Sequence, residues 1–191
     1  RLVQITSNPA IIDNAYRGIP AKAVALDKLV DKITGEGEQA IVWSIFTGNV
    51  DSLCRKYKSL GAVKITGKMS VYDRTRSVAA FKEGSARLLF ATPQSAKEGL
   101  TLTNANHAIF YDRGFNLDDY LQAQDRIHRI SQTKDCHIYN LMVDDSIDLW
   151  ISKLLEAKRQ AALLAQGDVS VGQYRETADY SFAHIVQQIL N

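Results

Sequence analysis

The chain has 191 residues, 46% hydrophobic and 23% charged, and its 23 lysines and arginines against 21 aspartates and glutamates leave a formal net charge of +2. This composition is that of one globular domain and excludes disordered, collagen-like and low-complexity chains, while the small net charge neither demands nor excludes nucleic acid. The two distant cysteines, Cys54 and Cys136, exclude a disulfide framework and fit a reducing compartment, and no apolar run is long enough to cross a bilayer.

The chain begins with a segment of helical pattern that extends to Gly35, and short apolar runs that alternate with further helical stretches follow it. The predicted strands are 41–46, 62–65, 87–92, 107–112 and 136–142, and the predicted helices between them are 51–60, 72–81 and 117–130. After Asp144 apolar residues recur at helical spacing as far as Gly167, and 177–190 is a weaker second helix. This alternation predicts an α/β fold, a parallel sheet with helices on both faces, plus a C-terminal helical extension.

Ligands of such a sheet bind in the loops after its strands, so these loops are the place to look for chemistry. Nucleotide hydrolysis on such a sheet usually needs a Gly-x-x-x-x-Gly-Lys-Ser/Thr loop to hold the phosphates. Residues 66–69, Thr-Gly-Lys-Met, come nearest but lack the first glycine and the final hydroxyl, and no Gly-x-Gly-x-x-Gly follows a strand. If the protein uses a nucleotide, most of the nucleotide pocket therefore lies outside these residues.

The most informative segment is 122–132, which reads Gln-Ala-Gln-Asp-Arg-Ile-His-Arg-Ile-Ser-Gln. On a helix, Gln122, Arg126 and Arg129 form one stripe opposite an apolar face. Two guanidiniums that project together suit a polyphosphate, because each is permanently charged and can bind two oxygens at once. The alternative is an ordinary solvated face on which Arg129 pairs with Asp125, and the spacing alone does not choose between the two.

Segment 122–132 resembles motif VI of the Swi/Snf family of superfamily-two DNA translocases, with Ser131 where the family usually has glycine. Other blocks follow in the order of that family: 1–9 is similar to the segment that joins the two motor lobes, 41–46 to motif IV, 65–81 to the next block and 88–106 to motif V. The resemblance covers about residues 1–155. It departs from the family where Ser-Ala-Lys at 95–97 replaces Ala-Gly-Gly, and where Phe115 and Leu117 replace Trp and Pro.

The resemblance implies that the chain is the second RecA-like lobe of a two-lobe motor, in which the absent first lobe carries the phosphate loop and binds most of the ATP with Mg²⁺. On this interpretation 1–21 is the interlobe connecting segment, 22–145 is the helicase C-terminal lobe and 146–191 is a helical extension. The isolated chain is then inactive. The partners are double-stranded DNA and the N-terminal lobe of the same parent, with no membrane, inside a cell. Because the chain starts with Arg1 rather than Met, we expect it to be part of a longer protein.

The resemblance also implies roles for particular residues. Arg129 is the expected arginine finger on the γ-phosphate with Arg126 beside it, and Gln122, Glu98 and Gly99 are expected near the nucleotide. The motor would hold one DNA strand by its phosphates, for which backbone amides, small hydroxyls and a lysine are suitable. The expected DNA contacts are Ser44, Thr66, Gly67, Lys68, Thr92, Gln94 and Lys97. For each hydroxyl the alternative is a turn or helix-cap role.

A second class of function stays open at this point. The same fold serves as a non-enzymatic module that binds nucleic acid or protein and has lost the motor. Arg126 and Arg129 favour the motor, because a binding module has no use for an arginine finger. A phosphate loop and an Asp-Glu box upstream in the parent gene would discriminate the two. The four histidines show no metal-ligand spacing.

Overall fold

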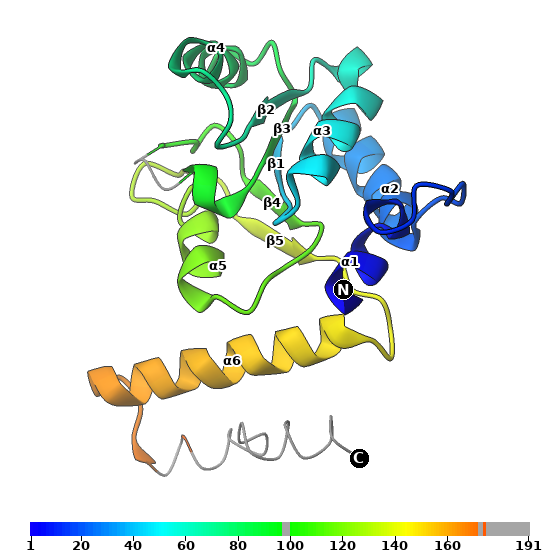
Figure 1. Ribbon diagram of the computed structural model, residues 1–191. Coiled ribbons are helices and arrows are strands. Elements are labelled where there is room, and N and C mark those ends of the chain that lie inside the picture. The colour runs from blue at the N-terminus through cyan, green and yellow to red at the C-terminus, as the bar shows by residue number, and fades with distance from the viewer. Residues whose placement is uncertain (97–99, 172–173, 175–191) are drawn as a thin grey trace.

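The computed structural model describes residues 1–96, 100–171 and 174, and its elements are arranged as in Figure 1. The helical elements in chain order are α1 (Leu2–Ser7), η1 (Pro9–Ile11), α2 (Ala21–Gly35), α3 (Thr47–Lys56), η2 (Lys58–Leu60), α4 (Val71–Lys82), η3 (Pro93–Ala96), α5 (Leu117–Gln124) and α6 (Ile147–Gln166). The strands are β1 (Ala40–Trp43), β2 (Val63–Ile65), β3 (Leu88–Ala91), β4 (His107–Phe110) and β5 (His137–Asn140).

The five strands form one sheet in the order β2-β3-β1-β4-β5, and every neighbouring pair is parallel. The register pairs Ile41 of β1 with Leu89 of β3 on one side and with Ala108 of β4 on the other. The predicted parallel sheet is therefore confirmed, with each strand shorter than its apolar run. The residues of each predicted run that lie outside its strand belong to the adjoining loops on either side.

The two faces of the sheet carry two separate cores. In β1, Ile41 and Trp43 pack with Phe81 of α4, whereas Ala40 and Val42 pack with Leu26 of α2. Figure 1 shows the same division, with α2 and α3 on one side of the sheet and α4 and α5 on the other. Side chains alternate across a strand, so a strand covered on both faces reads as a continuous apolar run. This explains why the strands were recognisable without any polar alternation.

Most of the predicted helices are confirmed with shifted ends. α3 begins at Thr47, four residues earlier than predicted, and 58–60 is a separate 3-10 turn. α4 begins after Ser70, whose hydroxyl accepts a hydrogen bond from the Asp73 amide. α6 ends at Gln166 and is capped by Gly167, whose φ of 82° is the left-handed conformation that glycine adopts without strain. The predicted helix 177–190 lies outside the described residues.

The prediction of one helix over 117–130 is wrong. α5 ends at Gln124, and the amide of Ile127 bonds to the carbonyl of Gln124 in a tighter turn. The Arg126 carbonyl accepts instead from the Leu102 amide at 3.2 Å. Ile127 is fully buried, whereas Ile130, expected on the same apolar face, is fully exposed. The backbone leaves the helix because this turn can bury Ile127 and pair with residues 100–105 at once.

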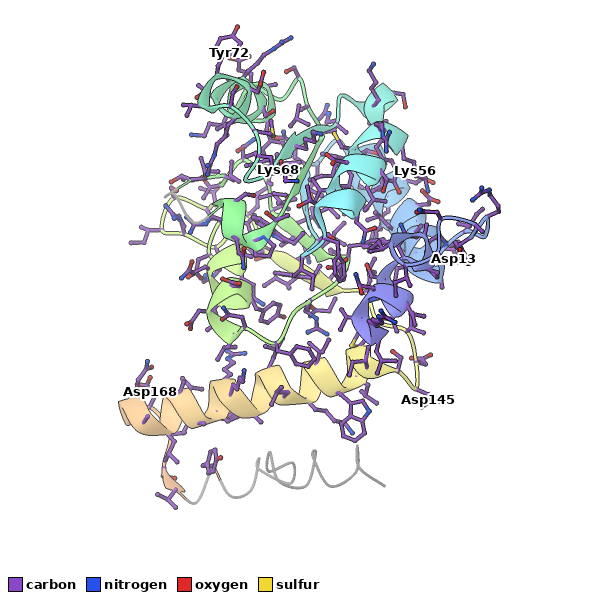
Figure 2. All side chains as sticks on the ribbon, viewed as in Figure 1. Asp13, Lys56, Lys68, Tyr72, Asp145 and Asp168 are labelled. Atoms are coloured by element: carbon purple, nitrogen blue, oxygen red, sulfur yellow. The ribbon has the colours of Figure 1, made fainter. Side chains whose placement is uncertain are left out.

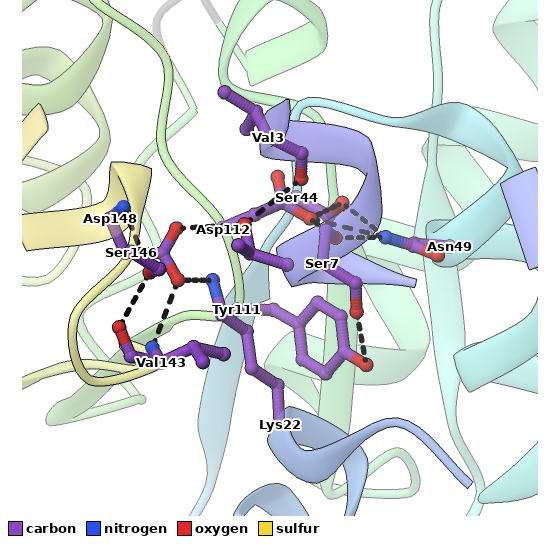
Figure 3. Close-up of polar contacts among 11 residues, drawn as sticks. Val3, Ser7, Lys22, Ser44, Asn49, Tyr111, Asp112, Val143, Ser146 and Asp148 are labelled. Atoms are coloured by element: carbon purple, nitrogen blue, oxygen red, sulfur yellow. Dashed lines mark hydrogen bonds and ion pairs between the residues drawn. The ribbon is translucent and has the colours of Figure 1, made fainter. Parts of the chain in front are cut away.

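A buried polar cluster attaches α1 to the carboxyl ends of β1 and β4. One carboxylate oxygen of Asp112 accepts from the hydroxyls of Ser7 at 2.6 Å and Ser44 at 2.7 Å, and from the Asn49 amide group at 3.1 Å (Figure 3). The other accepts from the Ile45 amide at 2.7 Å. Burial raises the pKa of Asp112, while these hydrogen bonds oppose the rise. α1 is therefore attached to the lobe through a buried hydrogen-bond network.

A buried ion pair lies next to this cluster and joins α2 to α6. Lys22 Nζ lies 2.7 Å from Asp148 Oδ2, with side chains that are 1% and 4% exposed. Asp148 also accepts from the Thr6 hydroxyl at 3.2 Å and from the Val143 amide at 2.9 Å. α6 runs along α1 and α5 below the sheet in Figure 1. None of the helices among the described residues is long and apolar enough to span a membrane.

Candidate functional site

A hollow of about 280 Å³ opens where the strands β1, β2 and β3 end. Its walls come from the loops after these three strands and from the first turn of α5. The lining residues are Ile45, Thr47, Gly67, Lys68, Thr92, Pro93, Gln94, Ser95 and Asp119. Four of the residues expected to contact DNA therefore meet at one surface: Gly67, Lys68, Thr92 and Gln94.

The wall formed by η3 is tied to its neighbours by hydrogen bonds. The Ser95 hydroxyl lies within 2.9 Å of the carbonyl oxygens of Ile65 and Thr92. Arg74 of α4 donates to the Ser95 carbonyl from the other side. Lys68, which is labelled in Figure 2, lies in the loop between β2 and α4. Its side chain is exposed. Among the described residues, the hollow thus combines a hydrogen-bonded wall with the exposed cation of Lys68 and the carboxylate of Asp119.

Two of the other expected DNA contacts face the interior. The Ser44 side chain is 1% exposed and donates its hydroxyl to Asp112. Thr66 is 5% exposed. Both side chains are thus buried within the lobe, and the expected DNA contacts at Ser44 and Thr66 stay predictions. Lys97 lies outside the described residues.

The two arginines of segment 122–132 lie past the end of α5 and contact one loop, residues 100–105, which we call the 100–105 loop. Arg126 is 6% exposed, and its Nη1 donates to the Leu100 carbonyl at 3.2 Å. Its Nε is buried without a hydrogen-bond partner among the described residues. Burial lowers the pKa of Arg126, and the neighbouring charge of Arg129 lowers it further.

Arg129 is partly exposed and is held at two points. Its Nε donates to the Asp125 carbonyl at 3.0 Å, and its Nη1 donates to the Thr101 hydroxyl at 2.8 Å. The expected alternative, an ion pair with the Asp125 side chain, is replaced by a bond to the Asp125 backbone. Gln122 is exposed on α5 itself and is not on one continuous helix with the arginines. Glu98 and Gly99 lie outside the described residues.

The 100–105 loop is in turn anchored to the core. Leu102 and Ala105 are fully buried, and the side-chain nitrogen of Gln132 lies within 3.2 Å of the carbonyl oxygens of Thr103, Ala105 and Ile127. Buried side chains and hydrogen-bonded carbonyls stabilise a loop in its place. The arginines therefore contact a loop that is anchored to the core.

Sequence reasoning missed three features of this region. Asp119 lines the hollow, Thr101 contacts Arg129, and Asp112 gathers the hydroxyls of a buried cluster. No local pattern marks the first two, because each depends on a contact between segments that are far apart in the chain. Among the described residues no group of three or more His, Cys, Asp or Glu side chains is placed to hold a metal ion.

Comparison with known proteins identifies the family and the fold of the chain. The family model of the helicase conserved C-terminal domain matches residues 21–131, more than half of the chain. Helicase swr-1 of Neurospora crassa is 32% identical over 178 residues, which are 88% of this chain and 9% of that protein. The chain spans 7% to 17% of the length of the curated relatives compared with it.

Two solved structures have the same fold. The C-terminal part of the Fun30 ATPase domain superposes with a TM-score of 0.66 and 29% identity, covering 81% of this chain and 53% of that one. The SWI2/SNF2 ATPase core of Sulfolobus solfataricus, solved in complex with double-stranded DNA, superposes with a TM-score of 0.69 and 24% identity, covering 94% of this chain and 40% of that one. The expected RecA-like fold is confirmed.

Proposed function

This chain belongs to the helicase conserved C-terminal domain family of SWI2/SNF2 ATPases, and from that membership we propose that it is the second motor lobe of an ATP-dependent double-stranded DNA translocase. Residues 1–21 join the two lobes, 22–145 form the lobe and 146–191 extend it. The partners are double-stranded DNA and the N-terminal RecA-like lobe of the same parent, in an intracellular compartment that holds DNA.

The observation that carries the proposal is the arrangement of Arg126 and Arg129 on the anchored 100–105 loop. A guanidinium has five N–H donors, and two of those of Arg129 are bound within the described residues. Its other donors have no partner among the described residues, and we propose that they bind the oxygens of a γ-phosphate. The proposed role is charge compensation as the phosphoryl group leaves, which is worth roughly 10³ to 10⁵ in rate where arginine fingers have been measured.

The nucleotide itself belongs mainly to the first lobe. The described residues include neither a phosphate loop nor a set of metal ligands, so we assign the binding of ATP with Mg²⁺ to the partner lobe. This chain supplies Arg129 and Arg126 to the reaction. Gln122, Glu98 and Gly99 are proposed on the nucleotide side of the lobe. On this proposal the isolated chain does not hydrolyse ATP.

The proposed DNA surface is the hollow at the ends of β1, β2 and β3. Gly67 and Gln94 offer exposed backbone or amide donors, Thr92 offers a hydroxyl, and Lys68 offers a charge, with Lys97 as a neighbour along the chain. Contacts of this kind recognise phosphates and carry no base information. A motor that moves along any sequence needs this kind of grip.

A non-enzymatic binding module of the same fold is the competing function. A binding module would need the hollow for its ligand. It would not need an arginine that is held by two hydrogen bonds and keeps further N–H donors for a phosphate. The contacts of Arg129 therefore favour the motor.

The test is turnover of the full-length parent with Arg129→Ala beside Asp125→Ala. A finger acts in the transition state, so Arg129→Ala is expected to reduce DNA-stimulated ATP turnover roughly 100-fold or more with nucleotide and DNA affinity changed only a few-fold. Asp125→Ala is the matched control, because the contact of Asp125 with Arg129 is made by its backbone carbonyl. The isolated wild-type chain gives the background rate. Near-normal hydrolysis by the Arg129 variant would refute the motor function of this segment.

A further inference from the structure

Among the described residues, the Thr101 hydroxyl contacts Arg129, the proposed arginine finger. Thr101 Oγ1 accepts from Arg129 Nη1 at 2.8 Å, and Thr101 lies in a loop whose neighbouring residue, Leu102, is fully buried. Nε of the same guanidinium donates to the Asp125 carbonyl at 3.0 Å. The two acceptors hold the guanidinium at two of its nitrogens, so they limit its rotation as well as its position.

We propose that Thr101 is a positioning residue for Arg129, an inference that rests on the function proposed above. The Thr101 hydroxyl fixes the direction in which the free N–H groups of the guanidinium point toward the phosphate. A long arginine side chain has many rotamers in solution, and only a few of them place the guanidinium on a transferring phosphoryl group. When the side chain is already held in a productive rotamer, less conformational entropy is lost on the way to the transition state.

The backbone of the 100–105 loop on either side of Thr101 is held by hydrogen bonds and by burial. The Leu102 amide donates to the Arg126 carbonyl at 3.2 Å, and Ala105 of the same loop is fully buried. The neighbouring carbonyl, that of Leu100, accepts from Arg126. One loop therefore sets both arginines in relation to each other, with a carbonyl for Arg126 and a hydroxyl for Arg129. Groups that orient a reacting side chain need such rigid backing to be effective.

The chain offers a closely matched control for the hydroxyl. Thr103 lies two residues along the same loop, is also partly buried, and its hydroxyl contacts Ser131 rather than an arginine. Valine has almost the shape of threonine without the hydroxyl. Thr101→Val and Thr103→Val therefore remove the same atom from two places on one loop. Thr101→Ser keeps the acceptor and is the conservative variant.

The experiment measures steady-state ATP hydrolysis of the full-length parent with saturating double-stranded DNA. Thr101→Val is expected to lower kcat roughly tenfold with the KM for ATP within about twofold, because a misplaced catalytic group costs rate rather than substrate binding. Thr101→Ser and Thr103→Val are expected to stay within about twofold of wild type. Thr101→Ala repeats the loss in case valine disturbs folding, and a melting curve of each variant shows which proteins are folded.

A double-mutant cycle separates positioning from other roles. If Thr101 acts through Arg129, adding Thr101→Val to Arg129→Ala causes no further loss of kcat. Additive losses would overturn the inference, as would a Thr101→Val protein with normal kcat or one that loses only its affinity for ATP. If Arg129→Ala is itself harmless, the proposed function fails and this inference fails with it. If Arg129→Ala is severely impaired while Thr101→Val and Thr101→Ala are both normal, the inference alone is overturned.

Discussion

The Lys22–Asp148 pair makes a sharp test of how α2 and α6 are held together. The Nζ to Oδ2 distance is 2.7 Å, and both side chains are almost fully buried. Lys22→Met removes the positive charge and keeps a similar volume, which leaves the Asp148 carboxylate buried without its counter-ion. Breaking a buried pair in this way costs about 3–5 kcal/mol of the free energy of unfolding.

The structure places the expected loss at the lower end of that range. Asp148 keeps its bonds from the Thr6 hydroxyl and the Val143 amide, which continue to stabilise the carboxylate. We therefore expect Lys22→Met to destabilise the chain by about 3 kcal/mol, which lowers the melting temperature by roughly 6–12 °C at this chain length. Replacing both partners by apolar residues, with Lys22→Met and Asp148→Leu, is expected to restore most of the loss, because no uncompensated charge is then buried.

The matched control is the exposed pair of Lys56 with Asp27. Its Nζ to Oδ1 distance is 2.6 Å, but both side chains are 40% exposed. Lys56→Met should therefore cost at most about 1 kcal/mol. The free energies of unfolding of the wild type, of Lys22→Met, of Lys22→Met with Asp148→Leu, and of Lys56→Met are measured by urea denaturation monitored by circular dichroism. Equal losses in Lys22→Met and Lys56→Met, or a double variant no better than Lys22→Met, would refute the reasoning.

Two further predictions concern charge at the surface. Lys68→Ala should reduce the slope of log DNA affinity against log salt by about one unit, since one phosphate contact is lost, and a slope unchanged in filter binding or anisotropy would remove Lys68 from the DNA surface. The pKa of Glu38 falls from its ordinary 4.5 to about 2, first through the hydrogen bond from Asn106 and then through that of His107. A carboxyl with a lowered folded pKa stabilises the fold above pH 4.5, and this contribution disappears as the pH falls toward 2. Glu38→Gln should therefore lose less stability than wild type when urea midpoints are followed from pH 5 to pH 2, and parallel curves would contradict this assignment.

The sheet and its covering helices could be predicted because their signals are local. The run around Ile41 and Trp43 is apolar on both faces, which indicates a strand buried on both sides, and the spacing of Ile151 and Leu155 indicates a helix with one buried stripe. The gathering of Gly67 and Lys68 with Thr92 followed from the same rule, because the carboxyl ends of parallel strands meet at one edge.

The surroundings of the arginines could not be predicted in this way. The residues of segment 122–132 were recognisable from their order, but the spacing that suggested a continuous helix was misleading from Asp125 onward. The competing contact, from the Leu102 amide to the Arg126 carbonyl, joins residues 24 positions apart. Helical periodicity says nothing about a bond of that range, which forms when the core closes around Ile127.

The order of residues along the chain was therefore enough to predict the fold class and the family, and to single out Arg126 and Arg129 as the candidates that act on ATP. Each of these predictions depends on short spacings and residue types. The tertiary structure alone decided which side chains are exposed and which are held by a buried neighbour. It buried the Ser44 hydroxyl against Asp112, left Lys68 exposed, and placed Thr101 against Arg129. The physical reason is that burial and hydrogen-bond partnership are properties of packed neighbours, and those neighbours come from distant parts of the chain.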